Sequence, residues 1–375
     1  MLYHALQVLC KQGGCGGMDG RRSGMRAARL ASVALLAFAF SCEPYASAPL
    51  SALPAGADWL QLAGTGDAML AASDDAVYAL DPRGALRVAR SAGGTRLAVE
   101  LATDGAHYGV YRPHGLELHD RAGARLATLA PAQLGFRHKL IGSERVLAPV
   151  IERRGPEEGR MVGIELRDVR GALQATIAAP DGVRFTRPSA DAITFAAAGR
   201  VARHAFDGRE LWSVPLAAQE LAVAAERDRV ALVTAEDARR VVLLADGLRI
   251  GAADLRAPIW NAALSPSGEH AAVTTQRSLH AFADGRLQLN QPLPLAHAVS
   301  LAVARDGRML VGGQDEHGRA RVLCYARGGE LLAEQGLAAE QQAFKPSVRW
   351  LDAERYAALG SAGPIYGRCP REVAP

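Results

Sequence analysis

One phrase recurs seven times along the chain, and this repetition constrains the fold more than any other feature. Each copy consists of a short apolar run, a turn that contains glycine, and a second apolar run, as in LELHDRAGARLATL and VARHAFDGRELW. Successive turn glycines lie 39, 48, 37, 39, 38 and 44 residues apart, and they are Gly84, Gly123, Gly171, Gly208, Gly247, Gly285 and Gly329. A period near 40 residues indicates a repeat architecture.

Two further apolar runs lie between phrases, for example Leu97–Leu101 and His107–Tyr111. Short apolar runs of this kind suit β-strands, and the Asp-Gly and Arg-Gly pairs supply the positive φ angles that tight hairpins require. No long stretch beyond the leader shows helical periodicity. The sequence therefore predicts an all-β fold, a β-propeller of seven or eight four-stranded blades over residues 58–370.

The chain after the seventh phrase bears on the number of blades. Three apolar runs follow it, at Val348–Leu351, Tyr356–Leu359 and Pro364–Gly367. We expect them to form three strands of an eighth blade, with residues 49–57 supplying the fourth strand and closing the ring, although this segment also fits a linker. Eight blades are favoured over seven, and residues 371–375 form a tail. The charged insert at residues 152–160 is expected to be a loop.

Residues 18–48 have the features of an export signal. Arg21, Arg22, Arg26 and Arg29 precede an apolar run from Leu30 to Phe40. Its eleven residues suit a signal segment and span only about half of a ~30 Å hydrocarbon core. The run ends at Ser41-Cys42, which resembles the lipobox of bacterial lipoproteins and implies lipidation of Cys42. Ala46-Ser47-Ala48 offers ordinary secretory cleavage instead, and residues 1–17 are interpreted as an over-extended or non-native start. The predicted location is the periplasm or the outer membrane as a lipoprotein, or else secretion.

Two cysteines follow Cys42, namely Cys324 and Cys369. An exported protein permits a disulfide between them. They lie in corresponding runs of the seventh and eighth repeats, so they are a candidate pair if their Cα atoms come within about 7 Å. Two separate buried thiols remain the alternative.

The net charge of +4 lies entirely in residues 1–42, and the rest of the chain is formally neutral. A neutral body lacks the basic surface by which proteins bind phosphate backbones, so we expect no nucleic-acid partner.

The phrases resemble the repeats of pyrroloquinoline-quinone-type propellers over about residues 58–367, and Gly208-Arg209-Glu210-Leu211-Trp212 is the nearest match. In that family the tryptophan docks between blades. The equivalent positions elsewhere lack it, and WD-like exported propellers fit nearly as well; those positions are Val88, Ala127, Ala175, Gly251, Leu289 and Ala333. The layout is similar to that of the propeller lipoproteins of the outer-membrane barrel assembly machinery, which implies a scaffold role. Quinone dehydrogenases carry adjacent cysteines that this chain lacks, so no cofactor is expected.

Other candidate sites are weak. His114 and His119 form a conceivable metal pair, but their odd spacing on a strand predicts opposite faces. Asp315-Glu316-His317 is interpreted as a solvated loop tip, and Asp74, Asp75 and Asp81 as turn residues. The chain contains neither a nucleophile elbow nor a P-loop. The tryptophans are interpreted as packing anchors between blades; they are Trp59, Trp212, Trp260 and Trp350.

The sequence thus predicts a non-catalytic exported propeller that serves as a protein-binding scaffold at the cell envelope, tethered to the membrane through lipid on Cys42. We expect no catalytic residues, metal or cofactor. The alternative is a propeller enzyme or ligand-binding protein with its site at the mouth of the central channel. A scaffold should expose an apolar patch on a blade face or rim, whereas an enzyme should gather titratable groups at one channel mouth.

Overall fold

The computed structural model describes residues 61–371, except residues 66–67, 73–75, 81–85, 92–97, 103, 113, 131–137, 143, 154–158, 337–346 and 361–362. These residues form eight antiparallel sheets, seven with four strands and one with three. No helix occurs among them. The eight sheets are numbered here as blades 1 to 8 in chain order.

The first four blades contain β1 (Gln61–Thr65), β2 (Ala68–Ala72), β3 (Ala76–Leu80), β4 (Leu86–Ser91); β5 (Ala98–Leu101), β6 (His107–Arg112), β7 (Gly115–Asp120), β8 (Arg125–Leu129); β9 (Lys139–Ile141), β10 (Arg145–Arg153), β11 (Gly159–Asp168), β12 (Leu173–Ala178); β13 (Phe185–Pro188), β14 (Ala192–Ala196), β15 (Val201–Ala205), β16 (Glu210–Val214). The last four contain β17 (Ala218–Val223), β18 (Arg229–Thr234), β19 (Arg240–Ala245), β20 (Leu248–Asp254); β21 (Ile259–Leu264), β22 (His270–Thr275), β23 (Ser278–Ala283), β24 (Arg286–Pro292); β25 (His297–Val303), β26 (Met309–Gln314), β27 (Ala320–Tyr325), β28 (Leu331–Gly336); β29 (Ser347–Trp350), β30 (Arg355–Gly360), β31 (Gly363–Arg368).

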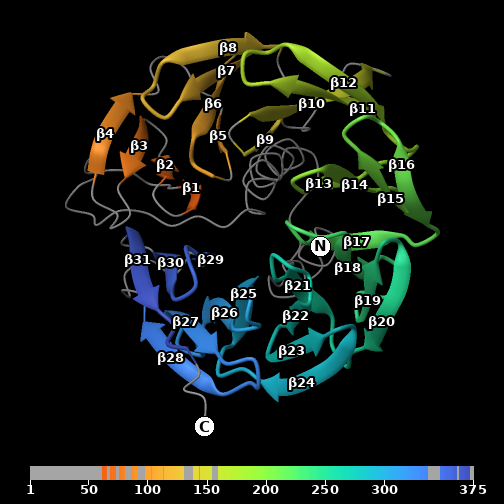
Figure 1. The fold of residues 1–375 in the computed structure, drawn as a ribbon. Helices are drawn as coiled ribbons and strands as arrows, with labels where there is room; N and C mark the ends of the chain where they lie inside the picture. The colour runs from red at the N-terminus through yellow and green to blue at the C-terminus, as the bar shows by residue number, and fades with distance from the viewer. Residues whose placement is uncertain are drawn as a thin grey trace, which may run out of the picture. The chain divides into compact units, whose positions relative to one another are not determined.

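Within the compact unit from Pro44 to Pro375, the blades follow one another around a common axis (Figure 1). The first strand of each blade lies nearest the axis and the last strand lies outermost. First strands of neighbouring blades contact each other, as β17 contacts β21 and β21 contacts β25. The propeller predicted from the sequence is confirmed, and so is an eighth blade built from the three trailing runs. The proposed closing strand at residues 49–57 lies outside the described residues.

Apolar side chains between neighbouring blades form the core. The cluster between blades 6 and 7, for example, joins Leu279 and Ala281 of one blade to Met309, Val311 and Leu323 of the next. Each of these side chains is at least nine-tenths buried. Such burial between sheets explains why the strands are apolar on both faces near the middle of each blade.

The turn glycines fall between the third and fourth strands, as the phrase predicts. In the six described copies their φ angles lie between 77° and 96°. Two of these turns have only two residues, Asp246-Gly247 and Asp284-Gly285, and both residues in each turn have positive φ. That is the hairpin geometry for which Asp-Gly is preferred, because its twist matches that of the flanking strands.

A β-bulge recurs at one position of the outer strand in blades 1 to 7. In each blade the third residue after the turn glycine has no partner on the neighbouring strand, and these residues are Arg87, Leu126, Gln174, Leu211, Ile250, Gln288 and Leu332. Pairing resumes after the bulge, at the fourth residue after the turn glycine, which is Trp212 in blade 4. Seven sheets therefore share one register, which is the structural counterpart of the sequence phrase.

The charged insert is not simply a loop. Its ends extend strands β10 and β11, with Glu152 paired to Arg160 and Arg153 paired to Gly159. The expectation of a loop is therefore wrong at residues 152–153 and 159–160. Arg160 also forms ion pairs with Glu152 and Asp181, which favour the extended hairpin.

Candidate functional site

Trp212 joins blade 4 to blade 5. Its indole Nε1 donates a 2.6 Å hydrogen bond to Asp228, which lies in the turn before β18 of the next blade. Burial raises the pKa of Asp228, and the hydrogen bond from Trp212 and the charge of Arg203 offset that effect only in part. The indole also packs beside the core cluster that Leu232 and Leu244 share. Trp212 is therefore a packing anchor between blades, as the sequence predicts.

Arg203 extends the same joint. Its guanidinium is almost fully buried and lies 3.2 Å from Asp228. Within blade 4 it donates to the hydroxyls of Thr194 and Ser189 at 3.1 and 2.8 Å. A buried charge with several partners holds a joint in one arrangement, because removing any partner leaves a polar group unsatisfied. Nothing in the local sequence marks this arginine as buried.

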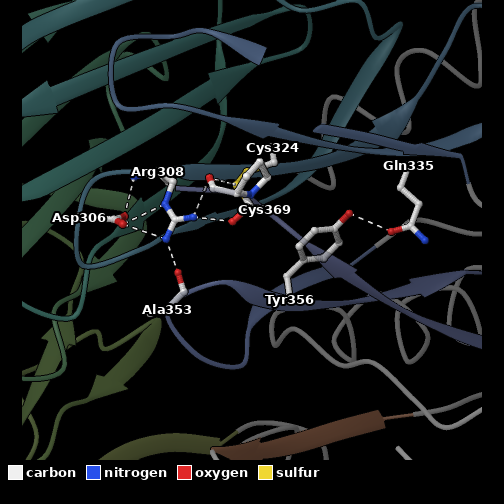
Figure 2. Close-up of a disulfide and its surroundings, with 8 residues drawn as sticks. Asp306, Arg308, Cys324, Gln335, Ala353, Tyr356 and Cys369 are labelled. Carbon is white, nitrogen blue, oxygen red and sulfur yellow. Dashed lines mark hydrogen bonds and ion pairs between the residues drawn. A yellow bond between two sulfur atoms is a disulfide. The ribbon is translucent and has the colours of Figure 1, made fainter. Parts of the chain in front are cut away.

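Cys324 and Cys369 are joined in the structure, with their Cα atoms 5.9 Å apart (Figure 2). Cys324 lies in β27 of blade 7, and Cys369 follows β31 of blade 8. The Cα separation satisfies the condition set from the sequence. Both side chains are fully buried, within a core cluster that also contains Val348 and Tyr356.

Arg308 is a second connection between blades 7 and 8. It lies in the turn between β25 and β26, and it donates to the carbonyl oxygens of Cys369, Pro370 and Ala353 (Figure 2). It also forms an ion pair with Asp306 at 2.8 Å, and its guanidinium lies 5.2 Å from the centroid of the Trp350 ring. Burial acts to raise the pKa of Asp306, but hydrogen bonds from Arg308 outweigh it and lower the pKa.

His119 has a structural role that the sequence analysis missed. Its Nδ1 lies 3.3 Å from the carbonyl oxygen of Gly123, and its ring stacks on Tyr108. In the next two blades Arg167 and His204 make the same contact with the carbonyl oxygens of Gly171 and Gly208. The signal was present in the sequence: in three consecutive phrases, a histidine or arginine stands four residues before the turn glycine.

The expectation that His114 and His119 lie on opposite faces is wrong. Both approach Glu117, at 3.2 and 3.7 Å, because His114 precedes β7 and does not follow the alternation of the strand. Burial acts to raise the pKa of Glu117, yet hydrogen bonds from Arg112 and His114 lower it overall. In the part of the chain that the structure describes, no group of three or more His, Cys, Asp or Glu residues is placed to hold a metal ion.

The loop tip at residues 315–317 is only partly solvated. Glu316 and His317 are exposed, but Asp315 is buried. Asp315 accepts the backbone N–H of His317 and of Arg319 and forms ion pairs with Arg319 and Arg321. Burial acts to raise the pKa of Asp315, but these bonds hold it well below the usual range. For Asp315 the solvated interpretation is therefore wrong.

Six side chains gather at one end of the axis, and we call them the axial cluster: Glu100, Lys139, Arg187, Glu220, Trp260 and His297. All lie within the first three residues of the first strands of blades 2 to 7. First strands run in the same direction in every blade, so their first residues share one end of the ring. Neighbouring blades are linked in pairs, with Lys139 3.4 Å from Glu100, Arg187 3.6 Å from Glu220, and the Trp260 and His297 ring centroids 6.4 Å apart.

Apolar side chains are exposed on the outer strands of five consecutive blades. We call them the rim row: Leu173, Leu211, Leu248, Ile250, Leu287 and Leu331. Each lies within the first three residues of β12, β16, β20, β24 or β28. Outer strands run antiparallel to first strands across a four-stranded sheet, so the rim row and the axial cluster lie at opposite ends of the ring.

The remaining predicted positions divide into two groups. Trp350 packs against Tyr356 at the joint between blades 7 and 8, whereas Trp260 is 42% exposed and is not an anchor. Its strand has a bulge at Trp260, which leaves this residue without a paired residue on β22. Cys42, Trp59, Asp74, Asp75 and Asp81 lie outside the described residues. No helix in the described ranges is long and apolar enough to cross a bilayer.

Eight sheets that follow one another around an axis define the chain as a β-propeller. No protein-family model matches it, and no curated protein sequence does.

Solved propellers match its fold. BamB from Moraxella catarrhalis is 15% identical, with 84% of this chain and 97% of that chain covered and a TM-score of 0.54. A eukaryotic initiation factor is 10% identical, with coverage of 88% and 91% and a TM-score of 0.57. KlAtg21, solved with the coiled-coil of AgAtg16, is 10% identical, with coverage of 74% and 95% and a TM-score of 0.54. At these identities the likeness shows the fold alone.

Proposed function

We propose that this propeller is an exported, non-catalytic scaffold that binds protein partners at the cell envelope. The rim row carries this proposal: it places aliphatic side chains near the start of the outer strand in five consecutive blades, and Leu248 is 72% exposed. Single exposed leucines are ordinary, but a repeated apolar row is typical of protein-interaction surfaces. One propeller of the same fold has been solved with a coiled-coil partner, which is consistent with this role.

Trp212 supports a kinship with pyrroloquinoline-quinone-type repeats, because it docks on the next blade as the tryptophan of that family does. Gly247, the next turn glycine, packs directly against it. The proposal extends to the repeat type but not to quinone chemistry, since adjacent cysteines are missing from the sequence.

Site-specific photocrosslinking tests the rim row. A photoreactive amino acid at position 287 is compared in the native cell with one at position 290, which is exposed on the same outer strand but outside the row. We expect a protein adduct from position 287 that disappears when Leu248 is also changed to Lys. Equal adducts from both positions, or adducts that survive Leu248→Lys, would reject the rim row as the binding surface.

The export and membrane tether are part of the proposal and rest on the basic and apolar leader that ends at Ser41-Cys42. Stable anchoring requires more than one acyl chain, as in multiply acylated lipoproteins. Metabolic labelling with a fatty-acid probe should mark the wild type and leave Cys42→Ala unlabelled. Label in both proteins, or in neither, would favour secretory cleavage after Ala48 instead.

A further inference from the structure

A groove lies between blades 4 and 5, beside the core cluster that these two blades share. Its volume is about 430 Å³, which is within the range of ligand-binding clefts, roughly 300–1,000 Å³. One wall is the segment that follows β16, and the other is the face of β19 and β20 that is turned toward blade 4. We call it the blade 4–5 groove, and its apolar middle is formed by Val214, Pro215, Leu216, Val242 and Leu244.

The register of β19 and β20 places charge at both ends of one wall and apolar side chains between them. Arg240 pairs with Asp254 at one end of the two strands, and Leu244 pairs with Arg249 near the other. Paired residues of antiparallel strands share a face, so both charged positions lie on the same wall as Leu244. From Arg240 to Leu244 the strand advances four residues, or roughly 13 Å. The two charged ends are separated by about that distance.

The two ends of the groove carry opposite charges. One end is lined by three carboxylates and one cation, namely Glu236, Asp237, Asp254 and Arg240. Arg240 pairs with Asp254 at 3.7 Å, which leaves the other two carboxylates without an ion pair among the described residues. At the other end Arg249 lines the groove, and its guanidinium forms no ion pair or hydrogen bond with the part of the chain that the structure describes. The first end therefore attracts cations and the second attracts anions.

We propose that the blade 4–5 groove binds an extended peptide segment of a partner protein. The segment places a basic side chain at the carboxylates, an apolar side chain over the middle and an acidic side chain at Arg249. Side chains on one face of an extended chain are two residues apart, so the first, third and fifth residues face the groove and span roughly 13 Å.

Two further points favour this occupant. A free amino acid carries its two charges too close together to reach both ends of the groove. A guanidinium binds a carboxylate bidentately, which suits an acidic residue at Arg249. The inference rests on the proposed scaffold role for its choice of a protein as partner, and it adds a groove between two blades to the rim row.

NMR titration of the mature protein with acetylated and amidated pentapeptides tests the proposal. The probe is Lys-Thr-Leu-Thr-Glu. We expect it to shift the amide resonances of Leu216, Gly247 and Arg249 in a saturable manner and to leave that of Gly329, the turn glycine of blade 7, unchanged. Peptides with lysine at both ends, with glutamate at both ends, or with serine in place of leucine should each bind at least about fivefold more weakly. Added salt should weaken binding of the probe.

Reversing one charge of the groove predicts a new preference, which a loss of folding cannot imitate. In Arg249→Glu both ends are acidic, so the peptide with two lysines should bind at least about fivefold more tightly than the probe. Arg286→Glu is the matched control, because Arg286 is exposed on the outer strand of blade 6 and does not line the groove. This variant should keep the wild-type order of affinities.

The proposal is overturned if the probe causes no saturable shift, if the control peptides bind the wild type equally well, or if Arg249→Glu keeps the wild-type order. These results are distinguishable from the photocrosslinking at position 287. Adducts at position 287 without peptide binding would reject the groove and keep the rim row. Peptide binding without adducts would reject the rim row and keep the groove.

Discussion

Arg308 shows how one side chain supports a whole joint. It donates to three carbonyl oxygens of blade 8, one in a buried bond and two in partly buried bonds, and it pairs with the Asp306 carboxylate, so its loss removes all of these contacts. Removing one member of a buried charged network costs about 3–5 kcal/mol. We expect Arg308→Met to lower the free energy of unfolding by about that amount in urea denaturation. Arg308→Lys should recover little, because an ammonium cannot reach carbonyls on several sides.

The matched control is Arg305→Met, three residues earlier, where the side chain is 68% exposed and pairs with Glu226. A surface ion pair of this kind contributes about 0–1 kcal/mol. Similar losses from Arg305→Met and Arg308→Met would contradict the role assigned to Arg308.

His138 should make stability depend on pH. Burial, reinforced by the charge of Arg167, lowers its pKa from an ordinary 6.5 to about 4, so it is neutral in the folded protein at pH 5. In the unfolded chain this histidine binds a proton below pH 6.5, and that protonation stabilises the unfolded state. This contribution to stability is therefore present above pH 6.5 and is lost as pH falls towards 4, by about 3 kcal/mol at most.

His138→Gln should flatten this loss between pH 6.5 and 4 in urea titrations. The exposed His317→Gln should keep the wild-type pH profile. Comparing profiles rather than absolute stabilities removes the packing cost of the substitution. Identical profiles for wild type and His138→Gln would show that His138 titrates normally.

At the scale of elements, two turns allow two energetic costs to be compared: that of a left-handed backbone, and that of disturbing a contact between blades. Gly247 and Gly318 have nearly equal φ angles, 77° and 73°. A Cβ at Gly247 would lie 2.7 Å from Trp212, whereas one at Gly318 would meet nothing within 4 Å. We expect Gly318→Ala to cost about 1 kcal/mol, from the left-handed backbone alone.

Gly247→Ala should cost clearly more than Gly318→Ala in the same denaturation experiment, because it also displaces the Trp212 indole that bonds Asp228. Fluorescence from Trp212 should change only in Gly247→Ala. Equal costs for the two variants would mean that the turn does not support the joint.

The sequence predicted the parts that depend on local spacing. Turn glycines define the hairpins between third and fourth strands, and the apolar runs define the strands, because both signals act within a few residues. The buried ionic groups could not be predicted in this way. Asp315 and Arg308 look like ordinary turn residues until the fold places other chain segments around them. Trp260 was also misassigned: it lies at a bulge of β21 and is 42% exposed, and an apolar run in the sequence indicates neither.

At the scale of the whole molecule, the joint between blades 7 and 8 joins the last blade to the rest of the ring. A bridge between Cys324 and Cys369 closes a loop of 45 residues. Loop entropy gives such a crosslink roughly 4 kcal/mol of stabilisation. We expect the mature protein, denatured without reductant, to show no free thiol at these positions.

Reduction should lower the unfolding free energy and speed amide hydrogen exchange in β29 to β31 more than in blades 4 to 6. The Cys324→Ser and Cys369→Ser double variant should match the reduced wild type. Two free thiols in the unreduced protein would instead mean that the cysteines are separate in solution, and Arg308 would then be the main connection between these blades.

The recurrent bulge has a consequence for which insertions and deletions the chain can accept. A connection between blades can change length without altering any strand. The loop-closure entropy grows only slowly with length, so each added residue there lowers stability little. Between a turn glycine and the fourth residue after it, the chain length is fixed by the bulge. Deleting Gln288 would remove the bulge and leave Leu287 and Leu289 as consecutive partners of Phe282 and Ala281, so β24 would lose the extra bend and twist that the bulge gives it. We therefore expect length variants of this protein to differ in their connections and to keep these four-residue intervals intact.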